Sequence, residues 1–373
     1  MSGRHTNMLR RVRRATAFTA GLVFLSFAAG HSPAVTVSET GSTLILPLFK
    51  AWVDAYAKVD PDLHVTVGAT NSSDGIAQVI AKHVQIGTSD AYMSDNTAMA
   101  NPHILNIPLA ISAQTIEANI PELRGASLKL SGSVLAGIYS GKIREWDEAA
   151  IAALNRGVHL PHHAIIPIHR ADGSGDTFIF TQFLTFSTRL SESGLTVPSD
   201  WEKRVGYGTS VNWPSVADSQ TVSGNPEMVQ ALGRTPYAVG YLGASFESDA
   251  DKAGLETAML QNQDGKFVLP TAVTITAAAA RLTPRTPPDE RLTLVFAPGA
   301  DSYPLINYEY AIVSVKQPNP QVAEAITNFL LWCIAPQGGS AVRFLDPVHF
   351  IVLPTTIRAL SEIQIAKIRQ PGA

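Results

Sequence analysis

Cysteine is almost absent from this sequence, in which Cys333 is the only one among 373 residues. A single cysteine excludes an intramolecular disulfide, whatever compartment the protein occupies. Cys333 lies close to Phe329, Leu330 and Leu331, and these apolar neighbours predict a buried, unreactive thiol. No cysteine lies near residues 30–34, so we expect no lipid anchor on an N-terminal cysteine.

Charge is also scarce. Charged residues make up 16% of the sequence and hydrophobic residues 45%, which is typical of a compact globular protein. Five of the 28 basic residues are arginines near the N-terminus, so 23 remain in the rest of the chain against 31 acidic residues. That remainder has a net charge near −8, which argues against nucleic acid as a partner. An anionic ligand would have to be held by local dipoles and a few placed charges.

Residues 1–34 are typical of a cleavable signal peptide. A basic segment without acidic residues ends at Arg14, an apolar segment runs from Ala15 to Ala29, and small residues follow. The apolar segment is short for a bilayer span. We therefore expect cleavage after Gly30 or Ala34 and a soluble periplasmic or secreted protein. The length of the remaining chain predicts about two domains.

The same local construction, a strand followed by a turn of small polar residues and then a helix, occurs three times. These turns lie at residues 41–44, 71–75 and 172–176. Helix N-termini stabilise oxyanions through their N–H groups and their dipole. At the third turn Arg170 adds a fork of donors and Ser174 a hydroxyl. The alternative is an ordinary turn in which Asp172 and Ser174 only cap the helix.

Strands and helices alternate along the whole chain, which predicts an α/β fold with mostly parallel sheets. In the third construction the strand covers 164–169, and a helical face follows at residues 179–184. We also expect a buried strand at 106–113 and a helix that is capped by Asp147. The pair Asn225-Pro226 predicts a helix start, with the asparagine as cap and the proline as first residue. Asn319-Pro320 predicts another. Other predicted strands lie at 35–38, 63–67, 84–87, 237–242 and 306–315, and other predicted helices at 44–58, 76–80, 134–139 and 355–368.

Hydrolase and nucleotide-binding motifs do not fit the sequence. The nucleophile elbow G-x-S-x-G does not occur, and Gly173-Ser174-Gly175 has other spacing and no base beside it. The run from Gly137 to Lys142 only partly resembles a phosphate loop, because Ile143 stands where Ser or Thr is required. We expect a helix end there. The sequence predicts no enzyme and no cofactor.

Metal sites are not predicted either. His159, His162 and His163 flank a proline in a polar segment, and no carboxylate lies beside them in ligand spacing. We expect solvated loop histidines. Asp249 and Asp251 begin like a calcium loop, but the ligand register does not continue.

Considered together, the turns and their surroundings resemble a known family. It comprises the phosphate-binding proteins of the high-affinity phosphate ABC transporter (PstS), which have the type II periplasmic-binding-protein fold. The resemblance covers nearly the whole chain after the signal segment. It is carried by Gly41-Ser-Thr43-Leu44, Asn71-Ser-Ser-Asp-Gly75, Ile86-Gly-Thr-Ser-Asp90, Tyr139-Ser-Gly-Lys-Ile143 with Trp146-Asp147, Arg170-Ala-Asp-Gly-Ser-Gly175, Val239-Gly-Tyr241 and Tyr303-Pro-Leu-Ile-Asn-Tyr308.

The resemblance implies two α/β lobes joined by paired hinge crossovers, with lobe I at 35–117 and 304–373 and lobe II at 118–303. It implies a monomer that captures inorganic phosphate between the lobes and delivers it to the subunits of a membrane ABC permease. The family's phosphate contacts would fall on Thr43, Leu44, Ser72, Asp90, Arg170, Ser174, Gly175 and Asp176.

Asp90 would set the specificity of such a site. Hydrogen phosphate carries a proton that a carboxylate can accept, whereas sulfate at neutral pH has none. A buried mismatch of this kind can reject an analogue by roughly 10⁴-fold. Asp90 thus argues against the alternative of a binder of another tetrahedral oxyanion, such as sulfate or molybdate. The remaining alternative, a secreted phosphate-ester hydrolase, lacks a nucleophile and base.

Two positions depart from the family. The family usually has threonine where this chain has Asp176, so a hydroxyl donor is lost. We favour Asp176 as a helix cap that faces away from the anion; the alternative is a second proton acceptor that biases the site toward dihydrogen phosphate. Asp74 replaces a usual small residue and is interpreted as an acid in the first turn of a helix.

Overall fold

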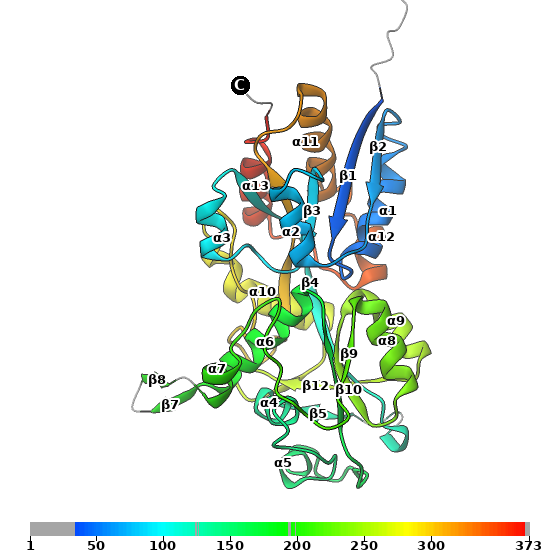
Figure 1. Ribbon diagram of the computed structural model, residues 1–373, viewed down its shortest axis with the longest axis vertical. Helices are drawn as coiled ribbons and strands as arrows, with labels where there is room; N and C mark the ends of the chain where they lie inside the picture. The colour runs from blue at the N-terminus through cyan, green and yellow to red at the C-terminus, as the bar shows by residue number, and fades with distance from the viewer. Residues whose placement is uncertain (1–33, 124, 126, 193–194, 198, 370–373) are drawn as a thin grey trace, which may run out of the picture. The chain divides into compact units, whose positions relative to one another are not determined.

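Two strands, β4 (Ile104–Ala118) and β14 (Ile306–Ser314), run antiparallel through the middle of the main sheet in the computed structural model (Figure 1). The structure describes residues 34–369 apart from 124, 126, 193–194 and 198. The predicted signal peptide, except Ala34, lies outside these residues. Both strands are buried along their full length, so they form the centre of the fold.

The main sheet has the strand order β2-β1-β3-β14-β4-β10-β6-β9, with β11 also paired to β4. Its strands are β1 (Val35–Gly41), β2 (Leu63–Val67), β3 (Ile86–Ser89), β4, β6 (Ile166–Arg170), β9 (Gln220–Val222), β10 (Ala238–Gly243), β11 (Glu256–Thr257) and β14. A small sheet contains β5 (Lys129–Leu130), β12 (Met259–Gln261) and β13 (Phe267–Val268), and β7 (Leu190–Glu192) pairs with β8 (Leu195–Val197).

The helices pack around these sheets (Figure 1). They are α1 (Leu46–Tyr56), α2 (Ser72–Ile80), α3 (Asp95–Ala100), α4 (Gly132–Tyr139), α5 (Ala149–Ala152), α6 (Gly175–Thr188), α7 (Asp200–Arg204), α8 (Gly224–Arg234), α9 (Glu247–Lys252), α10 (Ala272–Leu282), α11 (Pro320–Ile334), α12 (Val342–Leu345) and α13 (Thr355–Ile365). Among the described residues, no helix combines the length and the apolar character that a membrane span requires.

The predicted alternation of strands and helices is confirmed, but the expectation of mostly parallel sheets is wrong. Pairing is parallel toward both edges of the main sheet, between β2, β1 and β3 and between β10, β6 and β9. In the middle, β14 pairs antiparallel with β3 and β4, and β10 pairs antiparallel with β4. The periodicity of the sequence shows each strand but carries no information on the direction of its neighbour in the sheet.

One of the three predicted helix caps is confirmed, and two are wrong. Asn319 caps α11 through its side chain, and Pro320 is the first helical residue, as expected. Asp147 is not a cap, because α5 begins later, after Glu148. Asn225 is not a cap either, since α8 already begins at Gly224. The predicted helix end near Gly137 is confirmed by the end of α4 at Tyr139.

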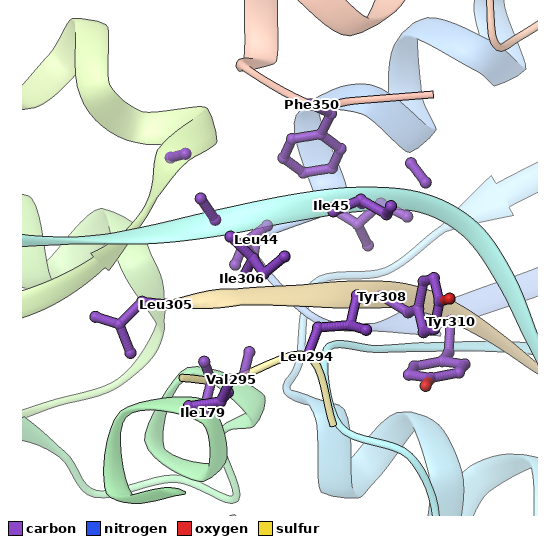
Figure 2. Close-up of a cluster of buried hydrophobic side chains, with 14 of the residues drawn as sticks. Leu44, Ile45, Ile179, Leu294, Val295, Leu305, Ile306, Tyr308, Tyr310 and Phe350 are labelled. Atoms are coloured by element: carbon purple, nitrogen blue, oxygen red, sulfur yellow. The ribbon is translucent and has the colours of Figure 1, made fainter. Parts of the chain in front are cut away.

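The core lies around the central strands. Figure 2 shows Leu305, Ile306, Tyr308 and Tyr310 along or beside β14, in one cluster with Ile179 of α6. Each of these side chains is at most 1% exposed. Burial of aliphatic and aromatic side chains contributes about 1.5–3 kcal/mol each, so β14 is held both by its hydrogen bonds and by packing. Cys333 is buried in the same core, as predicted. The lobe boundaries at 117/118 and 303/304 remain a prediction.

Candidate functional site

The turn before α6 supplies a helix N-terminus and an arginine. Strand β6 ends at Arg170, and Ser174 caps α6 by accepting a hydrogen bond from the N–H of Thr177 at 3.2 Å. The hydroxyl hydrogen of Ser174 remains available to donate, since the cap uses its oxygen only as acceptor. Gly175 and Asp176 are the first two residues of the helix, where N–H groups have no intrahelical acceptor. The turn therefore offers donors to an anion.

The turn before α2 holds a carboxylate. Asn71 caps α2 by accepting from the N–H of Asp74 at 2.9 Å, and Asp74 lies in the first turn as expected. Ser72, the first residue of α2, accepts from the backbone N–H of Asp90 at 3.1 Å and donates to Asp90 Oδ2 at 3.2 Å. Asp90 directly follows β3 and is 3% exposed. The helix start and the strand end thus fix the position of Asp90.

The turn before α1 contacts the same carboxylate. Ser42 donates to Asp90 Oδ1 and accepts from the N–H of Leu44, whose nitrogen lies 3.0 Å from the Ser42 Oγ. Thr43 and Leu44 are buried. Helix α1 has no side-chain cap, so the hydroxyl of Ser42 satisfies one backbone donor of this turn. Asp90 is therefore held from two of the three predicted turns.

The third turn lies directly against the second. The N–H of Ser73 donates to the carbonyl of Gly173 at 2.9 Å. A Cβ atom on Gly175 would come within 2.4 Å of Ser72 Oγ and 2.5 Å of Asp90 Oδ2, distances that no real Cβ atom tolerates. Glycine is thus required at this contact. The three turns that are far apart in the sequence come together, as predicted.

Arg170 lies in this group with its charge already paired. Its Nε donates to Asp172 Oδ1 at 2.6 Å, Nη2 to Asp172 Oδ2 at 2.5 Å, and Nη1 to Asp176 Oδ2 at 2.7 Å. Its backbone N–H donates to the Tyr241 hydroxyl at 2.9 Å. Burial alone would lower the pKa of Arg170. The hydrogen bonds to Asp172 and the charge of Asp176 raise the pKa by more than burial lowers it, so the net shift is upward. The side chain keeps two N–H groups for another acceptor.

The expectation that Asp176 caps α6 and faces away is wrong. Ser174 makes the cap, and the Asp176 carboxylate is 1% exposed. It accepts hydrogen bonds from Arg170, from Gln114 Nε2 at 2.9 Å and from Asn225 Nδ2 at 2.9 Å. A buried charged group requires such partners, and they draw Asp176 toward the other turns. Burial raises the pKa of Asp176, and the charge of Arg170 and the hydrogen bond from Asn225 reduce that rise.

Asn225 is a site residue that sequence reasoning assigned to a helix cap. Its Nδ2 donates to Thr43 Oγ1 at 3.0 Å and to Asp176, and its backbone N–H donates to Thr43 Oγ1 at 3.1 Å. Its Oδ1 accepts from the N–H of Gly243 at 3.0 Å. The Asn-Pro pair is a strong local signal for a helix cap, and it carries no information on the distant residues that this amide contacts.

Glu309 was also missed. It lies on β14 with an exposed fraction of 0%, and it accepts from Ser112 Oγ at 2.5 Å and from Asn307 Nδ2 at 2.8 Å. Burial raises its pKa to about 7, although hydrogen bonds from Asp90 and Ser112 lower it. A charged residue within a strand that is otherwise free of charge and mostly apolar was the signal that could have found it.

Asp90 and Glu309 behave as a pair. Burial raises the pKa of Asp90 well above its usual range, and the charges of Glu309 and Asp176 raise it further, while the hydroxyl of Ser42 lowers it. Two neighbouring buried carboxyl groups are costly to ionise together, so a proton on one of them is favoured. The site as a whole combines helix N-termini and one arginine with several carboxylates, which suits an anion that still carries hydrogen.

Comparisons with known proteins agree with this chemistry. Residues 28–337 match the family described as the PBP superfamily domain. The phosphate-binding protein PstS of Pasteurella multocida (strain Pm70) is 32% identical over 336 residues, which cover 90% of this chain and 91% of that protein. The chain belongs to the PstS family.

A second PstS protein, from Methanocaldococcus jannaschii, is 31% identical over 341 residues, which cover 87% of this chain and 84% of that protein. The solved structure of a phosphate-binding protein from Stenotrophomonas maltophilia has a TM-score of 0.63 at 19% identity and covers 88% of this chain and 94% of its own. This likeness concerns the fold alone. The predicted fold class, the α/β two-lobe fold of the PBP superfamily, is confirmed.

One histidine of the histidine-rich segment lies beside two carboxylates. His162 Nδ1 lies 3.0 Å from Glu145 Oε2 and 2.9 Å from Asp147 Oδ2. The fold brings these residues together although they are not in ligand spacing in the sequence. His162 and Asp147 are exposed and Glu145 is half-buried. Solvated pairs of this kind are common on protein surfaces, and we assign no metal there.

Proposed function

We propose that this protein is an extracytoplasmic binding protein that captures inorganic phosphate between two lobes and delivers it to a membrane ABC permease. The phosphate would be held by Thr43, Leu44, Ser72, Asp90, Arg170, Ser174, Gly175 and Asp176. The protein would act as a periplasmic or secreted monomer, without catalysis and without nucleic acid as a partner. Membership of the PstS family supports the ligand and the transporter class.

One observation carries the proposal, namely the contact of Asp90 with the N-terminus of α6. The Asp90 carboxylate is buried beside Gly175, and the next residue, Asp176, bonds Arg170 at the same helix start, where an anion would bind. A carboxylate at an anion site is unfavourable unless the anion brings a proton to it. Phosphate and its close analogues can do so at neutral pH, whereas sulfate cannot.

The site offers no base that would activate Ser174 as a nucleophile. Ser174 is engaged as a helix cap, and the charged groups in the same turn are Arg170 and its two aspartates. None of these is suited to remove a proton from the serine hydroxyl, because they are paired with one another. We therefore infer binding and release of intact phosphate.

Calorimetric titration of the purified protein with phosphate and with sulfate tests the proposal. We expect phosphate to bind and sulfate to bind at least about 100-fold more weakly. Asp90→Asn should weaken phosphate by about 10- to 100-fold, the loss of one hydrogen bond to a buried charge, and should not weaken sulfate. Equal affinity for both anions, or turnover of a chromogenic phosphate ester that is lost in Ser174→Ala, would refute the proposal.

A further inference from the structure

Asp176 is held by donors from three different elements. Arg170 at the end of β6, Gln114 on β4 and Asn225 on α8 each donate to it, the first and third to Oδ2 and the second to Oδ1. An ionised carboxylate has about four acceptor positions. Oδ2 is thus saturated, and Oδ1 keeps one lone pair. Asp176 directly follows Gly175 in α6, and Gly175 lies against Asp90 and Ser72.

The positive charge of Arg170 is not sufficient to neutralise a doubly charged anion bound beside Asp176. Asp172 already forms a two-bond pair with the guanidinium, and Asp176 adds a third bond. One positive charge therefore faces two carboxylates before any ligand is considered. Binding a doubly charged anion would place further negative charge in a buried region of low polarity, which is costly.

The charged and titratable groups that face Asp176 are mostly acids. These groups are Arg170 on β6, Asp172 in the following turn, Asp90 after β3, Glu309 on β14 and Tyr241 on β10. Four of the five are acids whose charged form is negative, with Tyr241 neutral in the physiological range because burial raises its pKa above the usual value. Arg170 is the only cation among them.

We propose that Asp176 makes the site select dihydrogen phosphate, the singly charged form, over doubly charged hydrogen phosphate. The inference rests on the proposed function. Asp90 accepts one P–OH hydrogen, and the spare lone pair of Asp176 Oδ1 accepts a second one. Threonine at this position would instead donate a hydrogen bond and would favour an unprotonated oxygen, so the substitution reverses the preference at one phosphate oxygen.

Proton uptake follows from this selection. Above the second pKa of phosphoric acid, solution phosphate is mainly the dianion, and each dianion that binds must take one proton from the buffer. The apparent affinity then falls about tenfold for each pH unit in this range. Burial also raises the pKa of Glu309 to about 7, so Asp176 is identified by the difference between matched proteins and not by one pH profile alone.

A purely structural role of Asp176 predicts something else. If the carboxylate only neutralised Arg170, its replacement would change stability and the affinity at every pH by the same factor. Asp172 already holds both Nε and Nη2 of that guanidinium, so Arg170 keeps its orientation in the variants. Proton uptake is the readout that a structural role would not move.

The test is calorimetric titration of the full-length mature protein with inorganic phosphate between about pH 6 and pH 9, in buffers with different ionisation enthalpies. We expect the wild type to take up about one proton per phosphate in the alkaline range. Asp176→Thr should take up about one proton fewer, and Asp176→Asn should resemble it. When Glu309→Gln is added to both the wild type and Asp176→Thr, the difference in proton uptake between the two proteins should persist, because Glu309→Gln removes the titration of Glu309 from both proteins alike.

The outcomes separate the two proposals. Phosphate binding without proton uptake in the wild type would overturn the role of Asp176 and leave the proposed function standing. Equal proton uptake in the wild type and both Asp176 variants would do the same. If the wild type binds no phosphate at any pH, the proposed function and this inference both fall. The wild-type measurement does not depend on whether a variant folds.

Discussion

Asn225 donates to Thr43 Oγ1 from both its side-chain amide and its backbone N–H, at 3.0 and 3.1 Å. The same amide nitrogen also bonds Asp176. One residue at the start of α8 therefore links the turn before α1 to the first turn of α6. Its side chain is 0% exposed, so none of these bonds can be replaced by solvent without a rearrangement.

We expect Asn225→Ala to weaken phosphate binding about tenfold or more. The variant leaves Thr43 and Asp176 each without one buried donor, and an unsatisfied buried acceptor costs about 1–3 kcal/mol. The free energy of unfolding should fall by a similar amount. Calorimetry with phosphate and urea unfolding measure the two effects.

Asn319→Ala is the matched control. Asn319 caps α11 by accepting from the N–H of Val322 at 2.9 Å, far from the site residues in sequence. Loss of the cap should lower the free energy of unfolding by about 1 kcal/mol and leave phosphate affinity unchanged. If the two variants lose phosphate affinity equally, Asn225 acts through stability alone.

Gly175→Ala should prevent the close contact of the second and third turns. The new methyl group would overlap Ser72 Oγ and Asp90 Oδ2, and overpacking of this kind costs about 1–3 kcal/mol. Phosphate affinity should therefore fall about 10- to 100-fold. Gly233→Ala in α8 is the comparison, since its Cβ would lie 3.2 Å from the Cβ of Ala253. An unchanged affinity in Gly175→Ala would show that the contact is not needed for binding.

Stability should decrease as the pH rises, because buried glutamates hold protons in the folded protein. Burial raises the pKa of Glu39 to about 8, and a hydrogen bond from Thr88 only partly opposes this. Glutamate in the unfolded chain loses its proton near pH 4.5. The folded protein binds the proton more tightly, so the stabilisation is complete below about pH 4.5 and is lost as the pH rises to about 8.

Glu39→Gln isolates this contribution. The variant keeps a neutral side chain of the same shape, so its free energy of unfolding should change less between pH 5 and 9 than that of the wild type, by several kcal/mol. Urea unfolding at several pH values measures the difference. Glu324→Gln, on an exposed position of α11, should follow the wild type; parallel curves for Glu39→Gln and the wild type would contradict the prediction.

The positions of the three turns were predictable from the sequence, because strand periods, caps and small turn residues are local signals. The set of residues expected at the site came from the resemblance to the family, and it did not include Asn225 or Glu309. The direction of pairing around β4 and β14 was not predictable in this way, since it depends on which distant strands become neighbours. Asp176 shows the same limit at one residue. In the sequence it resembles an acid at a helix start, and only the positions of Gln114 and Asn225 show where its carboxylate lies.

Strand β14 lies between β3 and β4, which precede it in the chain by at least half of the length of the protein. The sheet cannot be completed until residues 306–314 have been synthesised, and in the described part of the chain β3 and β4 have no direct pairing that could form earlier. Native contacts of such large sequence separation slow folding. We therefore expect the chain to remain unfolded long after its first strands emerge from the ribosome. The first quarter of the polypeptide should become stable only after the last quarter has been synthesised.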